Sequence, residues 1–144
     1  MRRYFVSPRR SWAPSVHRLL RPGGVFLVYD GHPMMSAMQY ERDDDLLVVG
    51  EPYFATGEPK RFDDGVTYAS DTLLENNVTY QWPHDLAEIL TAILNAGLRI
   101  EAFGEHQTIP WKALPGLVAT DRGWVLPDAS PKIPLMFSVV ARRP

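Results

Sequence analysis

The side chains best suited to chemistry lie just outside the apolar segments of the chain. Asp30 and His32 follow residues 25–29, a continuous apolar run of strand length, and His106 follows a second strand-like segment. His84 comes just before a long amphipathic segment. Ligands of open α/β sheets bind beyond the carboxyl ends of the strands. We therefore expect these side chains near a functional site.

Imidazole groups titrate close to neutral pH and are the usual proton acceptors of enzymes. His84 stands at the start of an expected helix, where the dipole would lower the pKa of an imidazole. His106 could pair with a carboxylate such as Glu105. We take His84 and His106 as candidate catalytic bases. A first-turn residue and a hydrogen-bonded loop histidine remain the alternatives.

The binding candidates are His32 and three aromatic residues. His32 is either a substrate contact or a loop histidine held by Pro33. Aromatic side chains beside a strand's carboxyl end often close over a pocket. Lid or core packing is the alternative for each of them. The candidate substrate-binding residues are His32, Tyr53, Phe54 and Trp82.

No metal site is expected. The histidines lack short ligand spacing, and three consecutive carboxylates at residues 43–45 read as a solvated turn.

The spacing of apolar residues predicts an α/β domain over residues 12–144, preceded by an irregular basic tail at 1–11. Residues 25–29 read as a strand buried on both faces. Pro83 suits a first helical turn, and Gly97 suits a helix end. The last two strands could pair as an antiparallel hairpin around an insertion. The expected elements are a helix at 12–20, a strand at 25–29, a loop-rich lid at 34–82, a helix at 83–96, and strands at 98–103 and 133–141. Shorter expected pieces are a helical turn at 34–39, strands at 46–49 and 78–82, a helix at 111–117 and an extended piece at 124–127.

The composition of the 144 residues excludes several classes of protein. The net charge of −2 and the absence of a long basic run argue against nucleic acid. No apolar run approaches the ~20 residues of a membrane span. Without cysteine the chain has no disulfide scaffold, and a reducing cytoplasm is the simplest location.

An ordered set of short motifs resembles one known family. Residues 19–28, Leu-Leu-Arg-Pro-Gly-Gly-Val-Phe-Leu-Val, are similar to the turn and fifth strand of class I S-adenosylmethionine-dependent methyltransferases. Other short segments, before and after this one, are similar to a bacterial branch that acts on small molecules. These are Trp12-Ala13, His32-Pro33, Pro52-Tyr53-Phe54, residues 80–84, 97–100 and 133–138, and Glu105-His106.

The resemblance implies the C-terminal half of a Rossmann-like methyltransferase sheet. That half has about three main strands, with the final antiparallel strand between two parallel ones. The family uses S-adenosylmethionine as methyl donor. We expect Asp30, at the end of the first strand, on the cofactor side of the site.

The sequence departs from the family in its donor site. The family's Gly-x-Gly-x-Gly turn and the acidic residue of its second strand have no counterpart, and Gly23-Gly24 precedes a strand instead of following one. We therefore expect a truncated methyltransferase-like chain that lacks the cofactor-binding half. By itself it would bind no donor and would be inactive.

Three functions remain open. The chain is part of a small-molecule methyltransferase completed by an N-terminal half, or a non-catalytic dimerisation or ligand-binding module derived from one. A weaker third reading is a protein that binds a hydrophobic ligand under its aromatic loops. Without a fourth strand beside it, the strand at 25–29 would present an apolar edge, which predicts a homodimer or a complementary half as partner.

Overall fold

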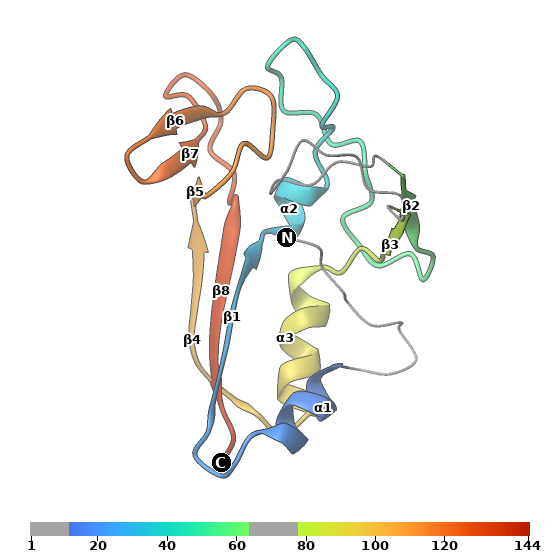
Figure 1. Cartoon of the computed structure of the whole chain (residues 1–144), viewed down its shortest axis with the longest axis vertical. Coiled ribbons are helices and arrows are strands. Elements are labelled where there is room, and N and C mark those ends of the chain that lie inside the picture. Colours follow the sequence, from blue (N-terminus) through green and yellow to red (C-terminus); the bar gives the residue numbers. More distant parts are fainter. Residues whose placement is uncertain (1–11, 64–77) are drawn as a thin grey trace.

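The computed structural model describes residues 12–63 and 78–144 (Figure 1). The basic tail at 1–11 and residues 64–77 of the lid lie outside the described residues. In chain order the elements are α1 (Trp12–Leu19), β1 (Val25–Gly31), α2 (Pro33–Ser36), β2 (Lys60–Phe62), β3 (Thr79–Gln81), α3 (Leu86–Asn95), β4 (Arg99–His106), β5 (Thr108–Ile109), β6 (Val118–Thr120), β7 (Gly123–Val125) and β8 (Met136–Arg142).

The central sheet has three strands in the order β1-β8-β4. β8 is antiparallel to both neighbours, so β1 and β4 run in the same direction. This is the strand order that the resemblance implied. The antiparallel pairing of the last two long strands is also confirmed, and the residues between them form a small separate sheet, β5-β7-β6.

The expectation that β1 is buried on both faces is wrong. Its residues alternate, with Leu27 64% exposed while Phe26 and Val28 pack against helices. Among the described residues β1 has only β8 as a neighbour, and no described helix covers its second face. The apolar run predicted a strand correctly but did not reveal that its second face lacks a cover.

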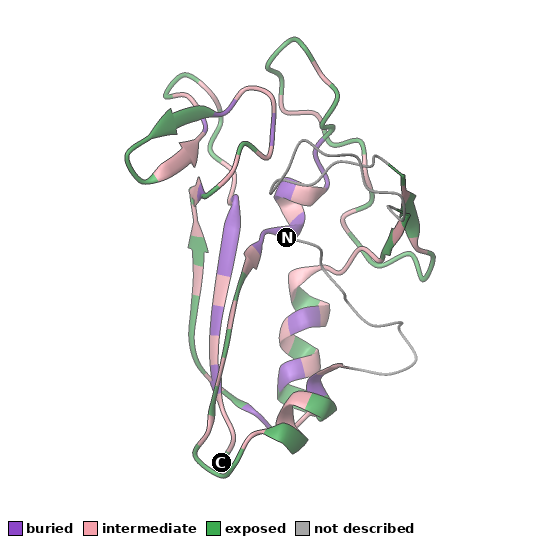
Figure 2. Cartoon of the chain, viewed as in Figure 1, coloured by how far each residue is buried: buried purple, intermediate pink, exposed green. Residues whose placement is uncertain are grey.

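Helices α1 and α3 lie together on one face of the sheet (Figure 1). Ile93 of α3 and Val139 of β8 are fully buried at the centre of this layer. β8 accordingly carries more buried positions than either neighbour (Figure 2). The apolar stripe of residues 86–94 therefore serves the packing role that its helical spacing predicts.

α3 is shorter at its start than the sequence suggested. Asp85 caps it, because its carboxylate accepts a hydrogen bond from the Glu88 N–H at 2.8 Å. Pro83 consequently lies before the helix and not in its first turn. At the other end Gly97 has a φ of +78°, as expected for a residue that ends a helix in the left-handed region.

Three strand boundaries also differ from those expected from the sequence. β1 continues to Gly31 and β4 to His106, because both keep pairing with β8 where turn residues were expected to end them. β8 begins at Met136 instead of residue 133. Asp30, Glu105 and His106 thus lie within the sheet and not in loops after it.

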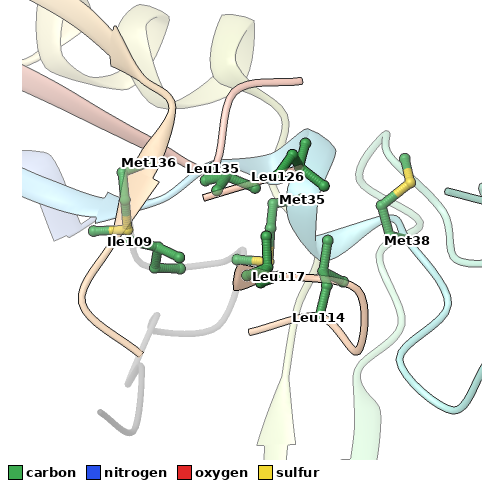
Figure 3. Packing of buried hydrophobic residues seen from close by; sticks show 8 residues of the cluster. All are labelled: Met35, Met38, Ile109, Leu114, Leu117, Leu126, Leu135 and Met136. Carbon is green, nitrogen blue, oxygen red and sulfur yellow. The ribbon is translucent and has the colours of Figure 1, made fainter. Parts of the chain in front are cut away.

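The shorter elements were predicted unevenly. The expected turn after β1 forms as α2, and the strand near residue 80 forms as β3, paired with β2. The strand expected at 46–49 is reduced to one bridge between Met38 and Val49. Residues 111–117 form turns, not a helix, and Leu114 and Leu117 belong to a second apolar cluster (Figure 3). This cluster joins α2 to the insertion and to the start of β8.

Candidate functional site

His32 anchors the chain where β1 passes into α2. Its side chain is 3% exposed. Nδ1 accepts a hydrogen bond from the Met34 N–H at 3.0 Å and so caps α2. Nε2 lies 2.9 Å from Oε1 of Glu105 on β4. The backbone N–H of His32 donates to the carbonyl oxygen of Leu135, which ties this point to β8 as well.

These contacts define the protonation of His32. Because Nδ1 accepts from an amide, the ring proton lies on Nε2 and is donated to Glu105. Burial lowers the pKa of His32 below its ordinary value of 6.5, although the hydrogen bond and the charge of Glu105 oppose that shift. His32 is therefore a neutral, doubly hydrogen-bonded residue at neutral pH. It does not line the cavity described next.

A cavity of about 640 Å³ opens beside the carboxyl end of β1. Gly31, Pro33 and Met35 supply its wall at the strand end, and Phe137 and Ile89 contribute from β8 and α3. The lid and the insertion supply the remaining walls, with Glu51, Tyr53, Glu58, Lys60, Phe62, Gln81, Trp82 and Trp111 among their residues. Its size is that of a site for a small organic molecule.

His84 lines this cavity from the segment before α3. Its side chain is 16% exposed, and Nδ1 lies 2.6 Å from Oε2 of Glu88, one helical turn further on. A carboxylate on one ring nitrogen orients the imidazole and favours its proton on that nitrogen. The arrangement suits a proton acceptor. His84 sits just outside α3, because Asp85 is the N-cap.

Asp30 also lines the cavity. It is half-buried near the end of β1, and its carboxylate accepts a hydrogen bond from the Gly31 N–H at 2.7 Å. A charged group is thus present at the strand end, on the same cavity as His84.

The three aromatic candidates divide by position. Tyr53 and Trp82 line the cavity. Phe54 is 71% exposed and packs edge-on against the ring of Tyr53, with centroids 5.1 Å apart. The aromatic lid therefore borders a cavity, and Phe54 supports it from outside.

His106 lies on the other face of the sheet. Nε2 is 2.8 Å from Oγ of Ser138, and its ring lies 5.3 Å from that of Tyr29. Tyr29 and Ser138 are direct partners in the β1–β8 register, and both alternate with residues that face the helices. The structure does not bring His32, His84 and His106 together, and His106 is not a lining residue of the cavity.

Several lining residues escaped the sequence reasoning. Lys60 and Glu51 form an ion pair at the cavity, and Trp111 reaches it from the insertion. Their only sequence signal was membership of the Pro-, Gly- and aromatic-rich segments. Which of these loop residues meet is decided by tertiary packing.

Two negative findings apply to the described residues, 12–63 and 78–144. No three side chains of the metal-ligating types group closely enough to hold a metal ion. No helix there is long and apolar enough to cross a membrane.

Comparison with protein-family models gives no match, and no curated protein matches the sequence. Solved structures do match. A protein of Listeria monocytogenes assigned as an S-adenosylmethionine-dependent methyltransferase shares the fold with a TM-score of 0.57 at 13% identity, over 92% of this chain and 53% of its own. An S-adenosylmethionine-dependent methyltransferase of Mesorhizobium loti matches with a TM-score of 0.54 at 19% identity, over 97% of this chain and 57% of its own. The chain thus has a methyltransferase-like fold and spans just over half the length of these two structures.

Proposed function

We propose that this chain is the substrate-binding half of a methyltransferase that acts on a small molecule. The observation that carries the proposal is the cavity at the carboxyl end of β1, bordered by Asp30, His84 and the aromatic lid. Fold likeness to two methyltransferases supports the reaction class. The place of the cavity agrees with the rule for ligand sites in α/β sheets.

The residues of this chain do not fit a complete donor site. The adjacent glycines, Gly23 and Gly24, are hydrogen-bonded to the backbone of Arg143, at the opposite end of β1 from the cavity. They cannot form a backbone cradle for S-adenosylmethionine at the strand's carboxyl end. We assign that cradle to a complementary half of the fold, with Asp30 as this chain's contribution to the cofactor side.

His84 is the residue that we propose as base. Glu88 accepts the Nδ1 proton, which leaves the ring's lone pair on Nε2, an atom with almost no exposed surface. A substrate hydroxyl or amine held in the cavity would pass its proton to His84 as it becomes nucleophilic. Tyr53 and Trp82 would hold the substrate in place, which is the larger contribution of the protein to a methyl transfer. Catalytic roles for His106 and substrate contact by His32 stay predictions without support from the cavity.

The first test measures binding to the purified chain. Saturation-transfer NMR with a mixture of small aromatic molecules should detect ligands. Phe62→Ala, which alters a lining residue, should remove them, and Phe103→Ala, which alters an exposed residue of β4 outside the lining, should not. Calorimetry should show no submillimolar binding of S-adenosylmethionine. Submillimolar donor binding by this chain alone would overturn the division into two halves.

The second test measures the reaction once a complementary donor-binding half is supplied. Labelled methyl groups should then be transferred to a small molecule. His84→Gln should lower the turnover and leave the ligand affinity within about twofold, as expected for a base that does not bind the ground state. Absence of transfer by the completed fold would contradict the proposal.

A dimerisation module is the second candidate, and the exposed strand β1 favours it. Val25 and Leu27 are 46% and 64% exposed, and the outer edge of β1 has no partner among the described residues. Such an edge readily pairs with another chain. Light scattering should show a dimer that Leu27→Lys dissociates, whereas Leu19→Lys, which changes a leucine of α1 that is 82% exposed, should not. A monodisperse monomer would count against this candidate.

A further inference from the structure

We infer that the lid side of the cavity recognises an organic cation, an ammonium group carried on an apolar body. The inference rests on the proposed function and names the substrate class of the same site. It is carried by three lid residues, Lys60, Glu51 and Phe62, which all line the cavity.

The contacts of the Lys60 ammonium group show which partners bind a cation in this part of the cavity. Its Nζ forms an ion pair with Glu51 and lies 5.3 Å from the centre of the Phe62 ring. Lys60 and Phe62 are the first and third residues of β2, so the period of a strand sets them on one face. A carboxylate and an aromatic face are the two partners that hold organic ammonium groups in proteins. The side chain of Lys60 therefore occupies a ready-made cation subsite.

The charge of the cavity favours a cation over an anion. Its described lining has three carboxylates, from Asp30, Glu51 and Glu58, and Lys60 is its one Lys or Arg residue. Only Glu51 is paired with that lysine, and Glu58 makes no ion pair within the described part of the chain. The carboxylate of Glu58 therefore attracts a cationic ligand and repels a carboxylate.

The rest of the lining fits an apolar body. Tyr53, Trp82 and Trp111 offer three large rings around a space of about 640 Å³. This volume is ample for one or two rings with a short side chain. A ligand whose ammonium group lies at Glu51 and Phe62 would extend its body along these rings toward the strand end.

In this arrangement the group that is recognised and the group that reacts lie at different ends of the substrate. Asp30 lies at the end of β1 and His84 just before α3, and we place the reacting end of the substrate at these two lining residues. The ammonium group would be the remote contact that selects the substrate, and Lys60 would yield its place to the incoming group.

The test compares three ligands of one shape by calorimetry at neutral pH. Phenethylamine is a cation, phenethyl alcohol is neutral and hydrocinnamate is an anion. We expect the amine to bind the full chain about tenfold more tightly than the alcohol, as one charge-assisted contact and one cation–π contact imply. Hydrocinnamate should bind more weakly than the alcohol.

Variants then separate the two partners of the subsite. Lys60→Met vacates it and should raise the affinity for the amine severalfold, with no change for the alcohol. Lys112→Met removes another exposed lysine that lies over an aromatic ring, that of Trp124, and should change neither affinity. Glu51→Gln should abolish the preference for the amine, whereas Asp121→Asn, in an exposed turn, should keep it.

The outcomes also separate this inference from the proposed function. Equal binding of amine and alcohol, both lost in Phe62→Ala, would overturn the cation subsite and leave the substrate cavity standing. Tighter binding of hydrocinnamate, lost in Lys60→Met, would make Lys60 an anion contact and overturn the inference. Failure of the chain to bind any small molecule would overturn the proposed function and this inference with it.

Discussion

Nε2 of His32 lies 2.9 Å from Oε1 of Glu105, so the carboxyl ends of β1 and β4 are joined across the intervening strand β8. The same imidazole caps α2, whose residues Pro33, Met35 and Ser36 form part of the cavity wall. His32 is thus a structural support for the site. It holds α2, a part of the cavity wall, in place without lining the cavity itself.

Replacement of His32 should therefore destabilise the fold. His32→Gln disturbs two side-chain hydrogen bonds in a buried position, and we expect a loss of about 1–3 kcal/mol in the free energy of unfolding. Urea denaturation followed by tryptophan fluorescence measures it. His17→Gln is the matched control, since His17 lies partly exposed on α1, and should change stability little. Equal effects of the two exchanges would contradict the supporting role.

The stability of the chain should also decrease as the pH falls below 6.5. Burial lowers the pKa of folded His32, whereas the unfolded residue keeps its ordinary value of 6.5. Between the two values the unfolded state binds more protons, so lowering the pH favours unfolding. Well above pH 6.5 both states are neutral at this residue, and its contribution is constant. Melting temperatures from pH 8 to pH 5 should show the decrease in the wild type, and a smaller one in His32→Gln; identical slopes would argue that other groups cause it.

The ion pairs of Glu101 predict a separate loss of folding stability in more acidic solution. Hydrogen bonds from Arg142 and Arg99 lower the pKa of Glu101 from 4.5 to about 2. Its stabilising contribution is therefore present above pH 4.5 and is lost as the pH falls from 4.5 toward 2. Glu101→Gln should flatten the acid limb of the stability profile at low salt. Because the pair is exposed, raising the salt concentration should reduce the difference from the wild type.

The N-cap of α3 should have a measurable effect on stability. Asp85→Ala removes the acceptor for the Glu88 N–H and should cost about 1 kcal/mol. Asp85→Ser retains a capping oxygen and should restore most of that stability. A failure of serine to restore it would show that the charge of Asp85, and not its hydrogen bond, matters.

Gly97 should tolerate few other residues because of its backbone conformation. Its φ of +78° is strained for residues with a Cβ, while the nearest atom to such a Cβ would be 3.9 Å away. Gly97→Ala should thus cost about 1 kcal/mol through the backbone alone. Gly97→Asn should cost less, since asparagine adopts this region more readily. Equal stability of wild type and Gly97→Ala in urea would exclude the strain.

Local patterns predicted the regular elements that hold the site. The stripe at residues 86–94 indicated a helix that packs on a sheet, and the runs near residues 25 and 136 indicated strands. These predictions hold because the period of a helix or strand appears as the spacing of its apolar residues on the buried side. That spacing is contained in the segment itself. Tyr53 and Trp82 were found in the same way, as aromatic residues in loops beside a strand end.

Other features could not be read locally. Residues 111–117 are predicted as a helix, yet they form turns, and Leu114 and Leu117 of these turns pack into the cluster around Met35. The alternation of burial in β1 depends on what covers its second face, a fact outside the strand itself. Tertiary packing overrides local preference wherever the two disagree.

The sequence by itself thus determined the type and order of the main elements, the sites of Asp30 and His84 next to them, and the likeness to methyltransferases. Only the tertiary structure decided that His32 supports the cavity from behind and that His106 faces away from it. It also decided that Lys60, Glu51 and Phe62 meet on one wall. The reason is that side-chain periodicity is a local property, whereas a cavity forms from residues that are brought together only when separate segments pack against one another.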